Sequence, residues 1–180
     1  MQLGADVADD TLLGTVPPFR PELVDAAGDA VDAFRRQIAE ADAVIIAAPE
    51  YAGSLAGTVK NALDWVVGTG ELYGKPVGIL SAGTTGGPFA RQVLARTLVW
   101  QGAHVVAQLG VTAPRTKSDA NGEISDAATI VMLEFFADTV LRAVCATADE
   151  RAAASELVAA SLDVRGHLDG ASIALAANFG

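Results

Sequence analysis

Two loops rich in small residues carry the groups that could bind a ligand. One runs from Pro49 to Gly57, directly after an apolar stretch, and the other runs from Ser81 to Gly87, at the end of a second apolar stretch. Both contain glycine and lead into a predicted helix, where free backbone N–H groups can bond to carbonyl oxygens or to anionic ring positions. The chemistry predicted from these loops is noncovalent binding of a planar ligand.

Glycine also has a plainer role in such loops, because it allows tight turns between a strand and a helix. For one loop alone we favour that explanation. Two loops at the same sheet edge favour ligand binding, since open parallel sheets bind ligands outside the C-terminal ends of their strands. A third loop, Gly110–Thr116, falls at the same edge.

The elements that must position these loops alternate between helix and strand. Continuous apolar runs predict buried parallel strands, and they occupy Ala43–Ala48, Pro76–Ser81 and His104–Leu109. Helical spacing of apolar residues predicts the helices. These cover 26–40, the stretches after Thr58 and Pro88, 127–146 and 149–162. We therefore expect an α/β fold with a doubly wound parallel sheet in one domain, 1–180.

Composition narrows the class of protein. The chain has 180 residues, 51% of them hydrophobic and 19% charged, which excludes a disordered chain. Its net charge of −10 argues against nucleic-acid partners and anionic membranes. No apolar run approaches the roughly 18 residues that cross a bilayer. The first ten residues are acidic and lack a signal-peptide core, so we expect a cytoplasmic protein.

The reactive side chains of the sequence suggest neither a protein nucleophile nor a metal site. Cys145 lies in an apolar helical pattern, which predicts a buried core thiol. His104 and His167 have no cysteine or second histidine at ligand spacing, so we expect no metal.

The first loop carries a family resemblance. Pro49–Gly57, followed by Lys60-Asn61-Ala62-Leu63-Asp64-Trp65, resembles the signature P-E-Y-N-G-S-x-x-G-x-x-K-N-A-x-D-W of the NADPH-dependent FMN reductases, a family that includes quinone and chromate reductases. The resemblance covers about 17–109 well. Further matches in order and spacing are Gly74-Lys75-Pro76-Val77, Ser81-Ala82-Gly83, Gly86-Gly87 and Gly102-Ala103.

The resemblance implies a flavodoxin-like fold with noncovalently bound FMN. It places the loop from Pro49, through the backbone of Glu50, Tyr51, Ala52 and Gly53, at the edge of the isoalloxazine ring. It places Ser81, Gly83, Gly86 and Gly87 beside the ring or on the nicotinamide side. It implies hydride transfer from NADPH or NADH through FMN to a quinone, free flavin or similar acceptor, with no protein acid or base required.

Single residues of the signature have alternative roles. Tyr51 borders the ring or only covers the loop, and Glu50 is a structural or subunit-contact carboxylate rather than a proton donor. Trp65 belongs to the core or an interface, while Lys60 and Asn61 fasten their helix to neighbouring backbone or to a partner subunit. The family's usual asparagine is replaced by alanine at position 52, which removes a side-chain amide but no backbone donor.

The main departure from the family concerns its phosphate loop. The family begins with a strand, a loop of the type G-S-x-R-x-x-S-x-N and a first helix, and this sequence has no such motif. Residues 11–25 resemble the family's second strand and its proline-rich exit. We therefore expect the usual first strand and helix to be missing, with a start codon placed too far downstream as the ordinary explanation. Unpaired strand edges would result, and Ile173–Ala177 is a candidate strand to fill the gap.

Three functions follow from this. The first is an NAD(P)H-dependent FMN oxidoreductase. The second is a non-enzymatic flavodoxin-like binding or interaction protein, a truncated family member unable to hold FMN. The third is a flavodoxin-like electron carrier. Family members also suggest a homodimer or homotetramer, with Trp65, Trp100 and the long last helix as interface candidates.

Overall fold

Three parallel strands form the sheet at the centre of the molecule. The computed structural model describes residues 4–8 and 12–162. The strands are β1 (Val44–Ala47), β4 (Pro76–Gly83) and β5 (His104–Thr112), in the order β1-β4-β5. All three begin within two residues of the predicted starts, and the α/β class with a parallel sheet is confirmed.

Helices and short turns account for most of the rest of the described chain. The helices are α1 (Asp29–Glu40), α2 (Gly57–Trp65), α3 (Pro88–Trp100), α4 (Ala127–Cys145) and α5 (Ala148–Leu162). The 3-10 turns are η1 (Leu12–Gly14), η2 (Pro21–Ala26) and η3 (Pro114–Thr116), and a small hairpin is made by β2 (Glu50–Tyr51) and β3 (Ser54–Leu55). Within the described residues, no helix is both long and apolar enough to cross a membrane.

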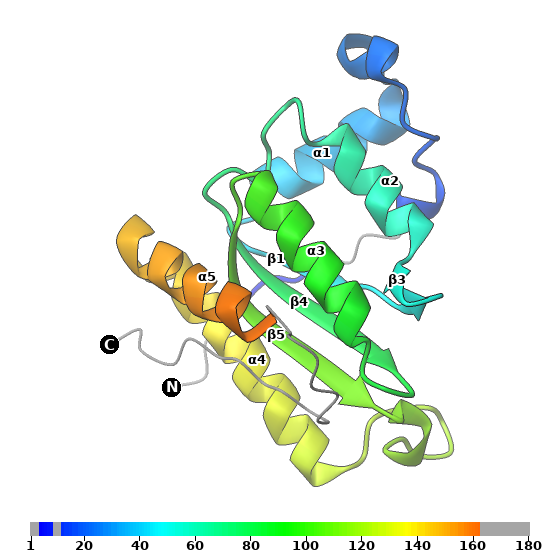
Figure 1. The fold of residues 1–180 in the computed structure, drawn as a ribbon, viewed down its shortest axis with the longest axis vertical. Coiled ribbons are helices and arrows are strands. Elements are labelled where there is room, and N and C mark those ends of the chain that lie inside the picture. Colours follow the sequence, from blue (N-terminus) through cyan, green and yellow to red (C-terminus); the bar gives the residue numbers. More distant parts are fainter. Residues whose placement is uncertain (1–3, 9–11, 163–180) are drawn as a thin grey trace.

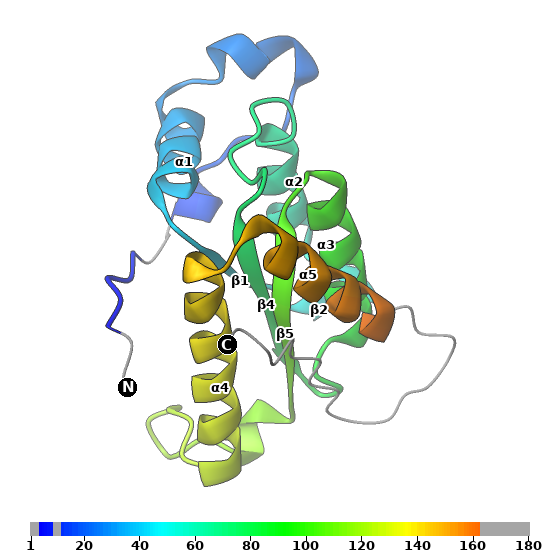
Figure 2. The ribbon, with the colours of Figure 1, turned by 90° about the vertical axis from the view of Figure 1, so that its left-hand side faces the viewer.

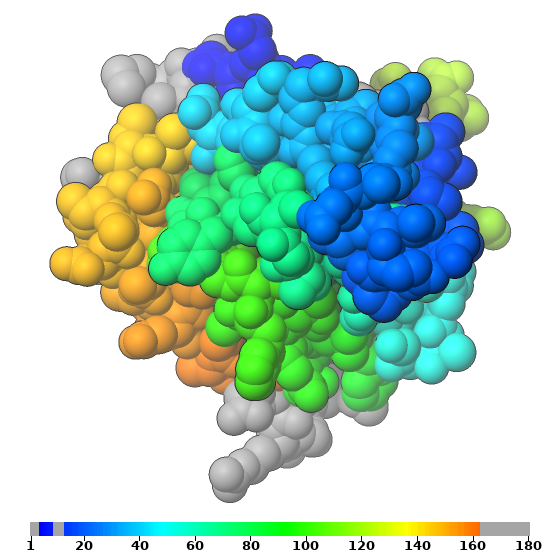
Figure 3. Space-filling model, turned by 90° about the horizontal axis from the view of Figure 1, so that it is seen from above, coloured from blue at the N-terminus to red at the C-terminus, as the bar shows by residue number. Residues whose placement is uncertain are grey.

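The sheet is covered differently on its two faces. Helices α1, α2 and α3 share one core cluster, and α4 belongs to the other. Figure 2 shows α3 and α4 on opposite sides of the sheet, which is also labelled in Figure 1. Val44 and Ile46 of β1 pack toward the first side, and Leu80 of β4 packs toward the α4 side. Seen from above, η2 and α1 (blue) form one side of the surface in view, and α3 (green), α4 and α5 (yellow to orange) form much of the rest (Figure 3).

Helix α4 comes unusually close to the sheet at Gly78. A Cβ atom at this position would lie 2.6 Å from Val140 Cγ2 and 2.8 Å from Phe136 Cζ. Only a residue without a side chain permits this approach. The buried stripe of α4 runs through Phe136 and Val140, and Cys145 lies roughly 180° around the helix from Phe136 at 100° per residue. Cys145 is therefore exposed, and the prediction of a buried thiol was wrong.

One edge of the sheet is covered by a helix, and the other has no partner strand among the described residues. Helix α5 covers the outer edge of β5, where the Val105 N–H donates to Ser155 Oγ at 3.2 Å. No described strand pairs with the outer edge of β1, and Ile45 there is 50% exposed. An unpaired edge next to this strand was expected. The candidate filler, Ile173–Ala177, lies outside the described residues.

The expected second strand does not form in the described part of 11–25. Residues 12–26 contain η1 and η2 instead. Pro17, Pro18 and Pro21 lack the N–H groups that a strand needs. The carbonyl of Pro17 accepts from Trp65 Nε1 at 2.8 Å, so this segment is bound to α2 rather than to a sheet.

Candidate functional site

The predicted ring loop, Pro49–Gly57, is a β-hairpin. Glu50 pairs with Leu55 and Tyr51 with Ser54, which leaves Ala52 and Gly53 as a two-residue turn. Both turn residues have positive φ, +51° and +70°, the combination that a type I′ turn requires. Leu55 is buried, whereas Tyr51 is 67% exposed. Pro49, between β1 and β2, is also exposed.

Glu50 connects the two loops. Its Oε2 accepts hydrogen bonds from the N–H groups of Phe89 at 2.8 Å and Ala90 at 3.1 Å. Pro88 has no N–H, and the Arg91 N–H bonds to Gly87 O. The N–H groups of Phe89, Ala90 and Arg91 in the first turn of α3 are therefore all bonded within the protein. The expectation that the Glu50 side chain has a structural role agrees with these contacts.

Ser81, Gly86 and Gly87 meet at the carboxyl end of β4. A Cβ on Gly87 would lie 2.0 Å from Ser81 Oγ and 3.6 Å from Glu50 Cβ. Ser81 is 2% exposed, and its hydroxyl has no hydrogen-bond partner among the described residues. Gly87 thus lies directly over an unused polar atom, where only glycine fits.

Gly83 and Gly86 shape the loop above this point. Gly83 O accepts from the N–H groups of Gly86 at 3.3 Å and Ala113 at 2.8 Å, which ties the loop to the chain after β5. A Cβ on Gly86 would lie 3.2 Å from the carbonyl carbon of Gly110. The structure therefore brings Glu50, Ser81, Gly83, Gly86 and Gly87 together at one sheet edge. The β2–β3 hairpin lies beside α3 (Figure 1).

Sequence reasoning missed two buried polar residues below this loop. Arg91 Nε donates to Gly86 O at 3.2 Å, and Arg91 Nη1 donates to Gln108 Oε1. Gln108 Nε2 donates in turn to Ser161 Oγ at 2.8 Å. Burial lowers the pKa of Arg91, and the Glu50 carboxylate partly opposes this. The available signal was a cation in the first turn of a helix, where the helix dipole disfavours it.

The second half of the signature has a structural role. Asn61 accepts from the Phe19 N–H at 2.8 Å and donates to Pro17 O at 2.9 Å. Trp65 is buried and meets Phe19 edge-to-face, with ring centroids 5.1 Å apart. Lys60 pairs with Asp64 on the same helix. Asn61 therefore fastens α2 to neighbouring backbone as expected, and Trp65 belongs to the core.

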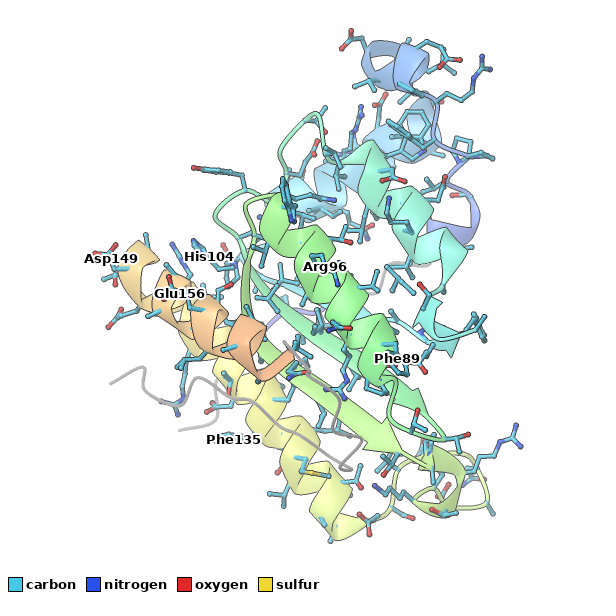
Figure 4. All side chains as sticks on the ribbon, in the orientation of Figure 1. Phe89, Arg96, His104, Phe135, Asp149 and Glu156 are labelled. Atoms are coloured by element: carbon cyan, nitrogen blue, oxygen red, sulfur yellow. The ribbon has the colours of Figure 1, made fainter. Side chains whose placement is uncertain are left out.

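A hollow of about 310 Å³ lies at the opposite end of the sheet, lined by Ala39–Asp42, Glu71, Tyr73–Pro76 and Arg151. Phe89 marks the candidate site and His104 the opposite end of the strands (Figure 4). The cations of this hollow bind carbonyl oxygens at helix ends, Lys75 at Ala39 O and Ala41 O and Arg151 at Ala143 O. We assign these contacts to helix capping and place the candidate site at the glycine loop.

Comparison with known proteins fits this geometry. The sequence model of the NADPH-dependent FMN reductases matches residues 6–117, more than half of the chain. The chain belongs to the NADPH-dependent FMN reductase family. It is 36% identical over 135 residues to an NAD(P)H-dependent FMN reductase of Pseudomonas aeruginosa, covering 63% of this chain and 73% of that protein. It is 31% identical over 133 residues to a 2-hydroxy-1,4-benzoquinone reductase of a Burkholderia species, covering 70% and 73%.

A solved structure supports the same assignment. The flavoenzyme NAD(P)H:(acceptor) oxidoreductase FerB from Paracoccus denitrificans superposes with a TM-score of 0.61 at 26% identity, covering 73% of this chain and 76% of that one. The flavodoxin-like fold is thereby confirmed. The family identifies the protein as a flavoprotein oxidoreductase that uses FMN and NAD(P)H.

The residues of the glycine loop fit such a ring. The buried Ser81 hydroxyl has no described partner, and Gly87, itself buried, covers it at a point that no Cβ can occupy, so this part of the loop presents backbone only. The exposed hairpin turn adds backbone at Ala52 and Gly53. In contrast, the start of α3 is capped by Glu50 and does not fit a phosphate.

Proposed function

We propose that the protein passes hydride from NADPH or NADH through bound FMN to a quinone, a free flavin or a similar small acceptor. The observation that carries this proposal is the glycine loop over Ser81, braced by Glu50 of the signature hairpin. The names of the relatives, which include FMN and quinone reductases, support this acceptor class. They do not favour a non-enzymatic binding protein.

The side chains and backbone have separate tasks in this proposal. The backbone from Pro49 to Gly53 borders the ring on one side, and Ser81, Gly83, Gly86 and Gly87 border it on the other. Glu50 holds the two loops in register by binding the start of α3. When bound, FMN supplies the hydride chemistry. The protein's part is to hold the ring and to keep the backbone dipoles fixed around it.

We further propose a cytoplasmic homodimer or homotetramer. Trp100 is 86% exposed at the end of α3, and Tyr73 is 81% exposed on the turn before β4. Large aromatic side chains are enriched at subunit contacts. Light scattering after size-exclusion chromatography measures the oligomer, and Trp100→Glu should reduce its size. An unchanged size would remove Trp100 from the proposed contact.

The proposed function is tested by FMN titration followed by NADPH and NADH oxidation with a quinone acceptor. We expect a yellow protein, a higher melting temperature with FMN, and acceptor-dependent oxidation. A colourless protein without a thermal shift on adding FMN would overturn the proposal.

Gly87→Ala tests whether the site lies at the glycine loop. The added methyl collides with Ser81 Oγ, so FMN affinity should fall at least tenfold. Gly122→Ala is the matched control, because Gly122 has a similar positive φ of +87° with open space around it. Ser81→Gly combined with Gly87→Ala removes the colliding atom and should restore part of the affinity. Equal losses in the Gly87 and Gly122 variants would contradict this placement.

A further inference from the structure

Arg91 is a buried cation to which the proposed reaction gives no role. It is 5% exposed in the first turn of α3. Both of its side-chain hydrogen bonds named above go to neutral oxygens, Gly86 O and Gln108 Oε1. Among the described residues, no carboxylate oxygen lies within 4.0 Å of it. Its charge is oriented by these contacts but is not cancelled by an ion pair.

Two physical effects disfavour a cation at this position. A buried charge without an ion-pair partner is costly, and a cation in the first turn of a helix opposes the helix dipole. The fold nevertheless makes room for it. A Cβ on Gly110 would lie 2.8 Å from Arg91 Nη2 and 2.9 Å from Cζ, so glycine is required on β5. A buried cation present despite both effects indicates a function.

The contact with Gly86 determines where the loop presents its donors. Because a trans peptide points its C=O and N–H in opposite directions, a Gly86 carbonyl that faces Arg91 turns the Gly87 N–H away from it. Burial lowers the pKa of Arg91, and its interaction with the charge of the Glu50 carboxylate raises it in part. Glu50 Oε2 accepts hydrogen bonds from the N–H groups of Phe89 and Ala90.

We propose that Arg91 supplies a fixed positive charge beneath the Gly83–Gly87 loop that favours anionic, electron-rich ligands at this end of the sheet. For the flavin, this means that Arg91 favours reduced FMN over oxidised FMN, a part that rests on the proposed function. Arg91 acts through the loop as an electrostatic and positioning residue.

A thiol probe tests the charge without FMN. Gly83 has an ordinary φ and no atom within 4 Å of an added Cβ, so Gly83→Cys is sterically allowed. In a Cys145→Ser background, the pH dependence of alkylation gives the pKa of this thiol. We expect a value below the usual 8.5 or so. Arg91→Met should raise it by about one unit, a tenfold change in proton affinity. An unchanged thiol pKa would overturn the proposal.

Gln108→Glu separates charge from structure. It keeps an acceptor for Arg91 Nη1 but adds a carboxylate whose negative charge offsets that of the guanidinium. The thiol pKa should therefore rise as it does in Arg91→Met. Arg91→Lys keeps the charge and loses the forked contact, so it should leave the thiol pKa near the unsubstituted value. Ser161→Ala controls for loss of the Gln108–Ser161 bond. If Lys behaves like Met and Gln108→Glu has no effect, Arg91 has only a structural role.

The flavin part is tested by the affinities of oxidised and reduced FMN. Gln108→Glu should weaken binding of reduced FMN about tenfold more than oxidised FMN, which lowers the midpoint potential by about 30 mV for a two-electron couple. Equal changes in both affinities would refute the flavin part. If the unsubstituted protein binds no FMN, the proposed function fails, while the thiol probe still decides whether Arg91 charges the loop.

Discussion

The turn of the signature hairpin contains a residue in an unfavourable backbone conformation. Ala52 has φ +51°, in the left-handed region, where L-residues other than glycine, asparagine and aspartate cost roughly 1–2 kcal/mol. The family's usual residue at this position, asparagine, tolerates this region. The departure from the signature therefore has an energetic consequence, because a type I′ turn needs positive φ at both central positions.

Ala52→Asn should accordingly stabilise the protein. Ala52 is exposed, so the substitution changes no packing. We expect a gain of about 0.5–1 kcal/mol in the free energy of unfolding, or about 1–4 °C in melting temperature for a chain of this size. Ala52→Gly should have little net effect, because glycine relieves the same strain but gives the unfolded chain about 0.4–1 kcal/mol more conformational freedom.

Thermal unfolding followed by circular dichroism measures both variants. Ala120→Asn is the control, since Ala120 is an exposed loop residue whose φ is not positive. It should leave the melting temperature unchanged. If Ala52→Asn gives no more stability than Ala120→Asn, the positive φ of Ala52 does not destabilise the protein, and the predicted strain in the turn is refuted. A stiffer turn should also tighten FMN binding, because less ordering is left to the binding step.

Three further variants test the packing and the charges away from the site. Asn61→Ala removes both bonds to 17–19 and should cost about 1–3 kcal/mol by urea denaturation, whereas Asn121→Ala in an exposed turn should cost almost nothing. Gly78→Ala should cost about 1–3 kcal/mol through overpacking, partly recovered by Val140→Ala. Burial and Arg151 lower the pKa of His104 from its usual 6.5, so below that pH the unfolded chain binds more protons and stability falls. His104→Gln should flatten this slope in melts between about pH 5 and 6.5; an unchanged slope would exclude His104 as its source.

The strands and helices could be predicted because each has a strong local signal. The apolar run before Pro49 and the run from Pro76 each became a strand of the sheet, and Pro88 begins a helix as its fixed φ favours. The hairpin was missed because its strands have two residues each, too short for any periodicity. An Asn-Gly pair would have predicted a hairpin turn here, but the sequence has Ala52-Gly53, which is a weaker signal.

The contacts that organise the site could not be read from local sequence. Glu50 binds the start of α3 across 39 residues, and Asn61 binds Phe19 across 42. Cys145 was assigned to the wrong side of α4, because a helix with apolar residues on several faces does not reveal its buried stripe. The proline-rich segment resembles a strand of the family but does not form one, because its prolines lack N–H donors and because it binds to α2.

The family signature therefore combines two physical tasks. Its second half, represented by Asn61 and Trp65, binds the proline-rich segment to α2 and has no contact with the glycine loop among its described hydrogen bonds. Its first half acts through Glu50, whose carboxylate occupies the positive end of α3. Glu50 is thereby held at the helix end, and among the described residues Arg91, in the same first turn, has no ion-pair partner. A carboxylate that does not form a direct ion pair with a cation offsets less of its charge than a salt bridge would, because the interaction weakens with distance. This separation is the basis for the positive potential that we propose at the loop above Arg91.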